Sequence, residues 1–405
     1  MSLCLRGASS LSPPLLAPPI PVLRSASLPR KLTFWRRRAV AALIAVGLGV
    51  GIWVALADGT TGEPDAPASA EGADAGDLTV RLLAGERIVA GFDGRHPPRA
   101  IRRMIRKGQL VGVILFSDNL GSRNHARRLT RRLQGIRRPR GLRDPLLVMI
   151  DQEGGRVKRI SGAPDVSAHV MGRRGVDYSR YEGARTARNL KRVGVNVNLA
   201  PVLDVGRPGS AIRAERRSFG GQPDRVARVA IPFAAAMERR GVVATGKHFP
   251  GLGGATRSTD LAVQRIRLGR GELRRIDERP FRAFADRNGD MVMISTAIYT
   301  HFSRKPAAFS KRIASRELRD RVGFAGVSIT DALDTVSARR FGGAAEAGVA
   351  AARAGTDLLL FTDQRDAARA GRALRRRLRS GNLPRRPFED SAQRVLDLRA
   401  RLFSR

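Results

Sequence analysis

Several short apolar stretches of this 405-residue chain are followed directly by polar side chains that could perform chemistry. The clearest case is Lys247-His248-Phe249-Pro250-Gly251, which follows the apolar run 242–246 and opens into a glycine-rich loop that reaches Asp260. A cation, an imidazole and a carboxylate close together can bind a polar ligand and transfer protons. Polar residues directly follow an apolar stretch at six other places: Asp93, 117–119, 151–153, Asp204, 295–296 and Asp331.

The apolar stretches that precede these residues predict a (β/α)8 barrel. Eight of them have the length of buried strands, and amphipathic stretches with helical spacing lie between them. A doubly wound open sheet is the alternative, but it normally has fewer strands and a glycine fingerprint after the first. The predicted strands are 87–92, 111–116, 146–150, 195–203, 242–248, 291–296, 327–330 and 357–361. The predicted helices include 99–106, 124–135, 223–240, 271–286, 311–321, 344–354 and 388–402.

The barrel interpretation brings the polar residues together. Catalytic groups of such barrels come from the C-terminal ends of the strands, so all seven places should face one mouth. Taken alone, Asp331 could be a helix N-cap, and Arg159 or Arg217 could be an ordinary surface or salt-bridging residue. Convergence of seven such places on one rim favours a functional site over these structural explanations.

The first 76 residues predict export. Residues 1–38 form a basic tail, and the cations of the segment 1–57 are not accompanied by any acidic residue. Residues 39–57 form an uninterrupted apolar run of membrane-spanning length, which predicts a transmembrane signal anchor, with a signal peptide cleaved after Ala57 as the alternative. The basic tail should then stay in the cytoplasm, and the rest of the chain should lie outside. Residues 58–76 have the composition of a disordered linker, and 77–405 should form the barrel.

The composition is strongly basic, with 75 Lys+Arg against 36 Asp+Glu and a net charge of +39. This charge indicates either a solvated arginine-rich surface or attraction to a polyanion, such as nucleic acid, a membrane surface or an anionic wall polymer. Aromatic residues make up only 5% of the chain and form no stacking stripe among the cations, so nucleic acid is not expected. The only cysteine, Cys4, excludes a disulfide framework and a cysteine-based metal site.

Five strings make the chain similar to glycoside hydrolase family 3, and in particular to its single-domain β-N-acetylglucosaminidases. Together they are specific, and the similarity extends from about Leu78 to the C-terminus. The strings are Asp151-Gln152-Glu153-Gly154-Gly155-Arg156-Val157-Lys158-Arg159, Asn198-Leu199-Ala200-Pro201-Val202-Leu203-Asp204-Val205, Arg216-Arg217-Ser218-Phe219-Gly220, Lys247-His248-Phe249-Pro250-Gly251 and Gly323-Phe324-Ala325-Gly326-Val327-Ser328-Ile329-Thr330-Asp331-Ala332-Leu333.

The resemblance implies that the chain hydrolyses terminal β-linked N-acetylhexosamine, with N-acetylglucosamine as the expected sugar. The glycan would come from the cell wall, as in peptidoglycan turnover, or from a related source. The implied mechanism retains anomeric configuration, uses no metal or cofactor and has Asp331 as nucleophile. Glu153 and Asp204 are expected to support the site rather than contact the sugar. The residues that align with the family's sugar-binding positions are Asp151, Arg159, Arg217, Lys247 and His248.

One loop departs from the family pattern. The family reads H-F-P-G-H-G and then D-S-H, where an Asp-His pair supplies the general acid/base. Here the corresponding residues are Gly251-Leu252-Gly253 and Ser258-Thr259-Asp260, so Asp260 occupies the place of the histidine. A carboxylic acid can do this work if burial or a nearby carboxylate raises its pKa, although Arg257 would oppose the shift. The alternatives are a family member that binds a glycan without turnover, and a surface protein that binds polyanions.

Overall fold

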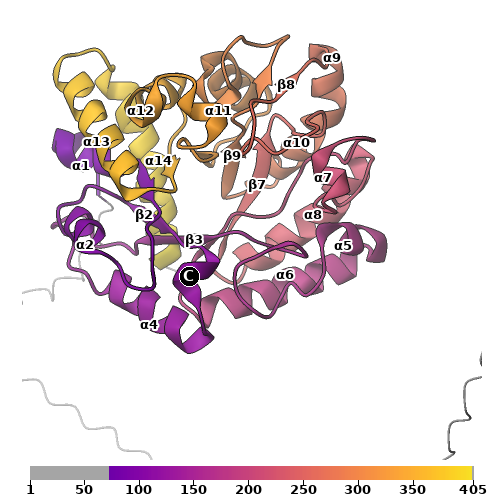
Figure 1. The fold of residues 1–405 in the computed structure, drawn as a ribbon, viewed down its shortest axis with the longest axis horizontal. Coiled ribbons are helices and arrows are strands. Elements are labelled where there is room, and N and C mark those ends of the chain that lie inside the picture. Colours follow the sequence, from indigo (N-terminus) through magenta and orange to yellow (C-terminus); the bar gives the residue numbers. More distant parts are fainter. Residues whose placement is uncertain (1–72, 404–405) are drawn as a thin grey trace, which may run out of the picture. The chain divides into compact units, whose positions relative to one another are not determined.

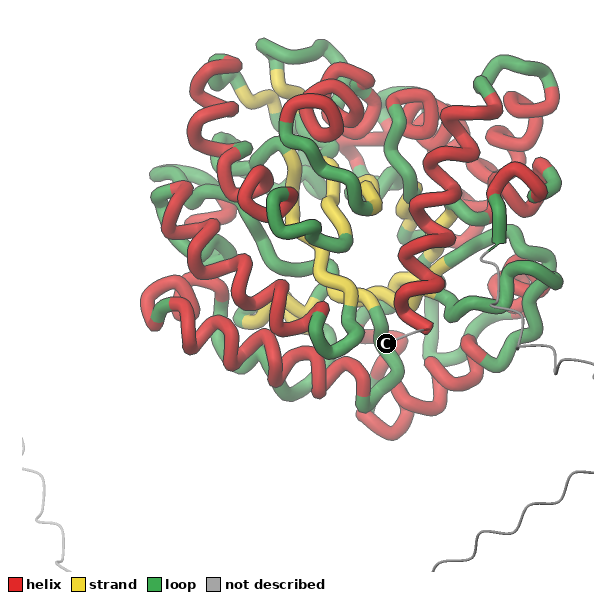
Figure 2. The backbone as a smooth tube through the Cα atoms, turned by 180° about the vertical axis from the view of Figure 1, so that it is seen from behind, coloured by secondary structure: helices red, strands yellow, loops and turns green. Residues whose placement is uncertain are grey.

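The computed structural model describes residues 73–403, in which eight parallel strands form the core of the molecule. Their order is β11-β9-β7-β6-β3-β2-β1-β12, and the two outer strands meet at a parallel bridge between Ile329 and Leu358, so the barrel is nearly closed. Figure 2 shows the strands enclosed by helices. The predicted barrel is confirmed, and the open sheet is wrong. The strands are β1 (Ile88–Ala90), β2 (Gly112–Ile114), β3 (Leu147–Ile150), β6 (Val197–Asn198), β7 (Val243–Phe249), β9 (Met291–Ile294), β11 (Val327–Thr330) and β12 (Leu359–Phe361).

Helices surround the strands (Figure 1), and most of them agree with the sequence prediction. The predicted helix 271–286 is interrupted: α9 (Arg270–Glu272) passes into a π-helical turn (Leu273–Asp277) before α10 (Arg279–Ala285), which begins with a proline at its first turn. The stretch Arg312–Arg321 is also π-helical. The other helices are α1 (Val80–Gly85), α2 (Arg99–Arg106), α3 (Ser117–Leu120), α4 (Arg123–Gln134), α5 (Ala168–Arg174), α6 (Val176–Lys191), α7 (Ala211–Ala214), α8 (Pro223–Glu238), α11 (Val336–Arg339), α12 (Gly343–Ala354), α13 (Gln364–Arg379) and α14 (Arg385–Phe403).

The inside of the barrel is filled by large apolar side chains from alternate strand positions, such as Val89, Met149 and Ile329. The helix α14 closes one end, because its Val395 and Leu398 pack into this interior cluster. That end is the N-terminal end of the strands, since buried Arg399 donates to the carbonyls of the loop that precedes β3 and pairs with Glu86, which precedes β1. The opposite, C-terminal end is left for a site.

Two small sheets lie at the C-terminal end of the barrel. β4 (Gln152–Gly154) and β5 (Val157–Lys158) form an antiparallel hairpin after β3, and β8 (Arg265–Ile266) pairs with β10 (Ile298–Tyr299). No helix within residues 73–403 is long and apolar enough to cross a membrane. The predicted anchor at 39–57, the basic tail and most of the predicted linker lie outside the described residues.

Candidate active site

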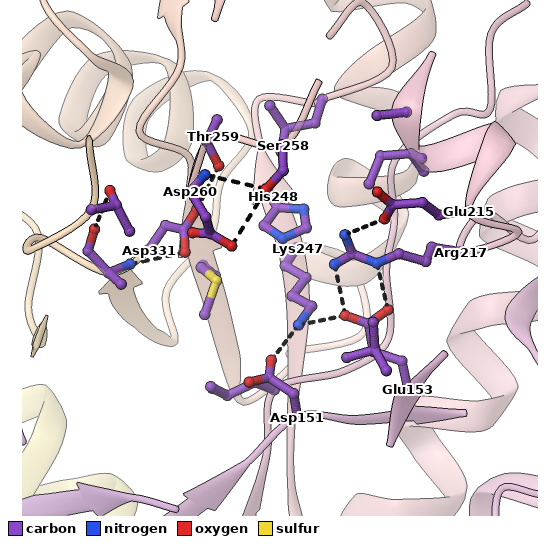
Figure 3. A pocket seen from close by; sticks show the side chains of 18 of the residues that line it. Asp151, Glu153, Glu215, Arg217, Lys247, His248, Ser258, Thr259, Asp260 and Asp331 are labelled. Atoms are coloured by element: carbon purple, nitrogen blue, oxygen red, sulfur yellow. Dashed lines mark hydrogen bonds and ion pairs between the residues drawn. The ribbon is translucent and has the colours of Figure 1, made fainter. Parts of the chain in front are cut away.

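A cavity of about 270 Å³ opens at the C-terminal ends of the strands (Figure 3). Its walls come from residues that follow β3, end β7 and follow β11, together with the loop 252–260 and the turn that carries Arg217. The structure brings all seven residues predicted for the site to this one cavity. They are Asp151, Arg159, Arg217, Lys247, His248, Asp260 and Asp331.

Buried charges of both signs form the base of the cavity. The Lys247 ammonium lies 2.7 Å from Asp151 Oδ1 and 2.8 Å from Glu153 Oε1. The Arg217 guanidinium donates to both oxygens of Glu153, at 2.8 and 2.9 Å, in the bidentate geometry that suits a carboxylate. Arg159 approaches the other oxygen of Asp151 at 3.6 Å. Glu153, expected only to support the site, is the centre of this network and lines the cavity itself.

The network keeps its members ionised. Burial opposes the charge on Lys247, but Asp151 and Glu153 outweigh it and raise the pKa of the ammonium. Burial would likewise raise the pKa of Glu153, but Arg217 and Lys247 hold it well below its usual range. Lys247 and Arg217 are therefore paired with carboxylates other than Asp331. The result is a fixed set of donors and acceptors that faces the cavity.

The ring of His248 contacts Asp204, which is fully buried, through its Nδ1. Asp204 Oδ2 lies 2.7 Å from His248 Nδ1, and Oδ1 accepts the backbone N–H groups of His248 and Leu252 at 3.1 and 2.7 Å. The carboxylate thus orients the imidazole and anchors the start of the divergent loop, which leaves Nε2 available to a ligand. This contact agrees with the supporting role expected for Asp204.

Asp331 directly follows β11 and lies within contact of the divergent loop. Its Oδ1 accepts the N–H of Ala332 at 2.8 Å, and its Oδ2 accepts a hydrogen bond of 3.3 Å from the Thr259 hydroxyl. Thr259 is buried, although its two neighbours in the loop are more accessible. The loop therefore reaches across the cavity from the end of β7 to the end of β11.

Asp260 sits at the cavity wall beside Asp331 (Figure 3). The negative charge of Asp331 and partial burial of the carboxyl raise the pKa of Asp260 to about 6. His248 and Arg217 oppose this shift. The residue as a whole is exposed, and Asp260 exchanges weak hydrogen bonds with Ser258, whose hydroxyl lies 3.4 Å from its Oδ2.

The polar residues at other strand ends do not line this cavity. Asn119 instead donates to the carbonyls of Phe92 and Gly94, so it fixes the loop after β1. Sequence reasoning also missed several residues of the wall, because no motif marks them. They include Phe116, Glu215, Met293, Thr335 and Thr362.

Comparisons with known proteins agree with this geometry. Residues 79–398 match the family described as "Glycosyl hydrolase family 3 N terminal domain". An "Uncharacterized secreted glycosyl hydrolase" of Arthroderma benhamiae is 36% identical over 338 residues, which cover 80% of this chain and 94% of the relative. A "Beta-hexosaminidase" of Pseudomonas aeruginosa is 33% identical over 282 residues, or 69% of this chain and 82% of the relative.

Solved structures show the same architecture. A glycoside hydrolase family 3 β-N-acetylglucosaminidase from a Paenibacillus strain matches with a TM-score of 0.76 and 30% identity, over 80% of this chain and 63% of that one. A β-N-acetylhexosaminidase from Beutenbergia cavernae matches with a TM-score of 0.74 and 28% identity, over 80% of this chain and 99% of that one. The chain therefore belongs to glycoside hydrolase family 3, through the N-terminal domain that defines the match.

Proposed function

We propose that this protein is an exported glycosidase that removes terminal β-linked N-acetylhexosamine, preferably N-acetylglucosamine, from cell-wall or related glycans. Its family and its hexosaminidase relatives support a hydrolase of O-glycosyl bonds. The sugar, the mechanism and the site of action are parts of the proposal.

The observation that carries the mechanism is the pairing of Asp331 with Asp260 at one cavity. In the first step, a carboxylate oxygen of Asp331 attacks the anomeric carbon while protonated Asp260 gives its proton to the departing glycosidic oxygen. In the second step, Asp260 takes a proton from water, whose oxygen displaces Asp331 from the sugar. A pKa raised to about 6 suits Asp260 to both duties, because it can hold and release a proton near neutral pH.

The charged base of the cavity supplies the recognition. A sugar hydroxyl donates one hydrogen bond and accepts others, so it needs both signs of partner. Arg159, Arg217 and Lys247 provide donors, Asp151 provides an acceptor, and His248 offers its free ring nitrogen. Since these groups are already held by one another, little ordering is needed when the ring binds.

Hydrolysis of aryl glycosides tests the proposal. The purified full-length protein should release the aryl alcohol from an aryl N-acetyl-β-glucosaminide, and Asp331→Asn should reduce the rate to background. Asp320→Asn is the matched control, because Asp320 is an exposed carboxylate outside the cavity. The proposal would be overturned if wild type and Asp331→Asn were equally inert on several aryl sugars.

A second candidate function is glycan binding without turnover. The absence of an imidazole in the divergent loop and the exposure of Asp260 favour it. This alternative requires that N-acetylglucosamine oligomers bind in calorimetry while no sugar is released. Calorimetry without any glycan binding would rule it out, whereas turnover that depends on Asp331 would favour the enzyme.

Export is proposed from residues 1–76 and is supported by the secreted relative. A protein anchored by residues 39–57 would sediment with membranes, whereas cleavage after Ala57 would release a chain that begins at Asp58. The N-terminal sequence of the mature protein separates the two. A full-length protein found in the cytosol would contradict both.

A further inference from the structure

A second hollow, which we call the basic groove, lies on the outside of the barrel between α2 and α13. The two helices follow β1 and β12, which are neighbouring strands of the barrel, and they appear on the same side of the molecule in Figure 1. The groove has a volume of about 710 Å³ and shares no lining residue with the cavity that contains Asp331.

Two rows of cations line the basic groove. Arg103 of α2 and Lys107, the residue that caps its C-terminus, form one row, and α13 contributes a longer row along its length. Successive cations of a row are three or four residues apart, so they lie about 4.5–6 Å apart along the helix axis. The rest of the lining consists of small or apolar residues and two glutamines. The α13 row is Arg365, Arg369, Arg372 and Arg375, and the other lining residues are Ala100, Met104, Gln109, Gln364, Ala367, Ala368 and Gly371.

The protein itself scarcely neutralises these charges. Among the described residues, no acidic side chain lines the groove. Of its six cations only Arg369 forms an ion pair with another described residue, at 2.8 Å from Asp366. Burial lowers the pKa of Arg375, and the positive charges of Arg372, Arg379, Arg81 and Arg376 lower it further. Mutual repulsion of this kind is relieved when an anion binds.

The shape and lining of the groove indicate the kind of anion. Six cations at regular spacing on two neighbouring helices fit a linear polymer with charges at regular intervals, rather than a single small anion. No aromatic side chain of residues 73–403 lines the groove, so this part of the chain supplies no platform on which the bases of single-stranded nucleic acid could stack. We propose that the basic groove binds a linear polymer of sugars or polyols joined by phosphodiesters, and so holds the protein on an anionic glycan outside the catalytic cavity.

Binding to poly(glycerol phosphate) tests this inference. The full-length protein should bind it, and the logarithm of the binding constant should fall linearly with the logarithm of salt concentration. The triple variant Arg103→Gln, Arg365→Gln, Arg372→Gln should bind ~10–100-fold more weakly, with a salt slope smaller by about 2, because three phosphate contacts are lost. These three arginines make no ion pair within residues 73–403, so their removal should leave the fold intact.

A matched variant separates the groove from the general charge of the chain. Arg127→Gln, Arg128→Gln, Arg131→Gln removes three exposed arginines from α4, which do not line the basic groove, and should retain wild-type affinity. Circular dichroism and the unfolding midpoint check that both variants are folded. Equal losses in the two variants would overturn the proposal, as would no binding by wild type. Tighter binding to single-stranded DNA of equal charge, or to anionic phospholipid vesicles, would also overturn it.

Discussion

The hydroxyl of Thr259 donates a hydrogen bond of 3.3 Å to Oδ2 of Asp331 and so joins the divergent loop to the carboxylate at the end of β11. In the proposed mechanism this carboxylate attacks the sugar. The Thr259 hydroxyl holds the carboxylate in one orientation while Ala332 donates to the other oxygen. The loop that lost the family's histidines therefore still contacts the proposed nucleophile.

Thr259→Val should lower kcat on an aryl glycoside by about 2–10-fold, the value of one ordinary hydrogen bond, with a smaller effect on KM. Thr300→Val is the matched control, because the Thr300 hydroxyl also donates at 3.3 Å, but to the Ile266 carbonyl outside the cavity. Steady-state kinetics on both variants measure the difference. Identical kcat values for the two variants would show that the contact with Asp331 has no catalytic role.

The pH profile should report the protonation of Asp260. A general acid must carry its proton, so cleavage of substrates with poor leaving groups should decline as pH rises through about 6. Asp260→Asn should lower this cleavage by about 10²–10⁴-fold, while substrates with very good leaving groups lose little in the first step. The rates on substrates with poor and with very good leaving groups are measured for the wild type and for Asp260→Asn over pH 4 to 9. If the decline of the rate near pH 6 persists in Asp260→Asn, a group other than Asp260 causes it.

The raised pKa of Asp260 should itself depend on Asp331. Because the charge of Asp331 is its largest cause, Asp331→Asn should lower the pKa of Asp260 towards its usual value. Carboxyl titration by carbon NMR measures this directly and needs no turnover. An unchanged pKa would mean that burial, rather than the neighbouring carboxylate, sets it.

The centre of the ion network should matter for stability. Glu153→Gln leaves the buried Lys247 and Arg217 short of one negative charge, which should cost about 3–5 kcal/mol of unfolding free energy. Glu215→Gln is the control on the same arginine, since its single contact is 3.3 Å long and more accessible, and it should cost at most about 1 kcal/mol. Because the pKa of Glu153 is held low, its contribution is present above the pKa of the unfolded chain and is lost as pH falls. Urea unfolding at pH 7 and pH 4 measures both effects. Equal costs for the two variants would contradict the central position of Glu153.

The sequence predicted the places of the strands well because most of them are apolar runs buried on both faces. The predicted strand 195–203 is longer than the strand observed there, since β6 comprises only Val197–Asn198. It predicted the helices less well where a helix packs through a face that shows no apolar periodicity in the sequence. The buried face of α6 consists mostly of small or polar residues, so no apolar stripe marks it. One of them is Gly183, where a Cβ would lie 2.3 Å from the Phe233 carbonyl of α8. The residues that carry motifs could be assigned to the site, whereas the contact of Thr259 with Asp331 joins positions 72 apart in the chain and depends on how the loop folds.

Gly251 shows how tightly that loop is constrained. Its φ of 131° lies in the region that favours glycine, and a Cβ there would meet the Cβ of Asp277 at 2.6 Å. Its carbonyl accepts the Tyr299 hydroxyl at 3.0 Å, so the backbone cannot move away without losing this bond. Gly251→Ala should therefore displace the loop that carries Thr259 and Asp260. Expressed as free energies, the loss in kcat/KM should be larger than the loss in stability that the unfolding midpoint reports. Gly269→Ala is the control, because a Cβ at that position meets nothing within 4 Å. If Gly251→Ala kept wild-type kcat/KM, the position of the loop would not be what catalysis depends on.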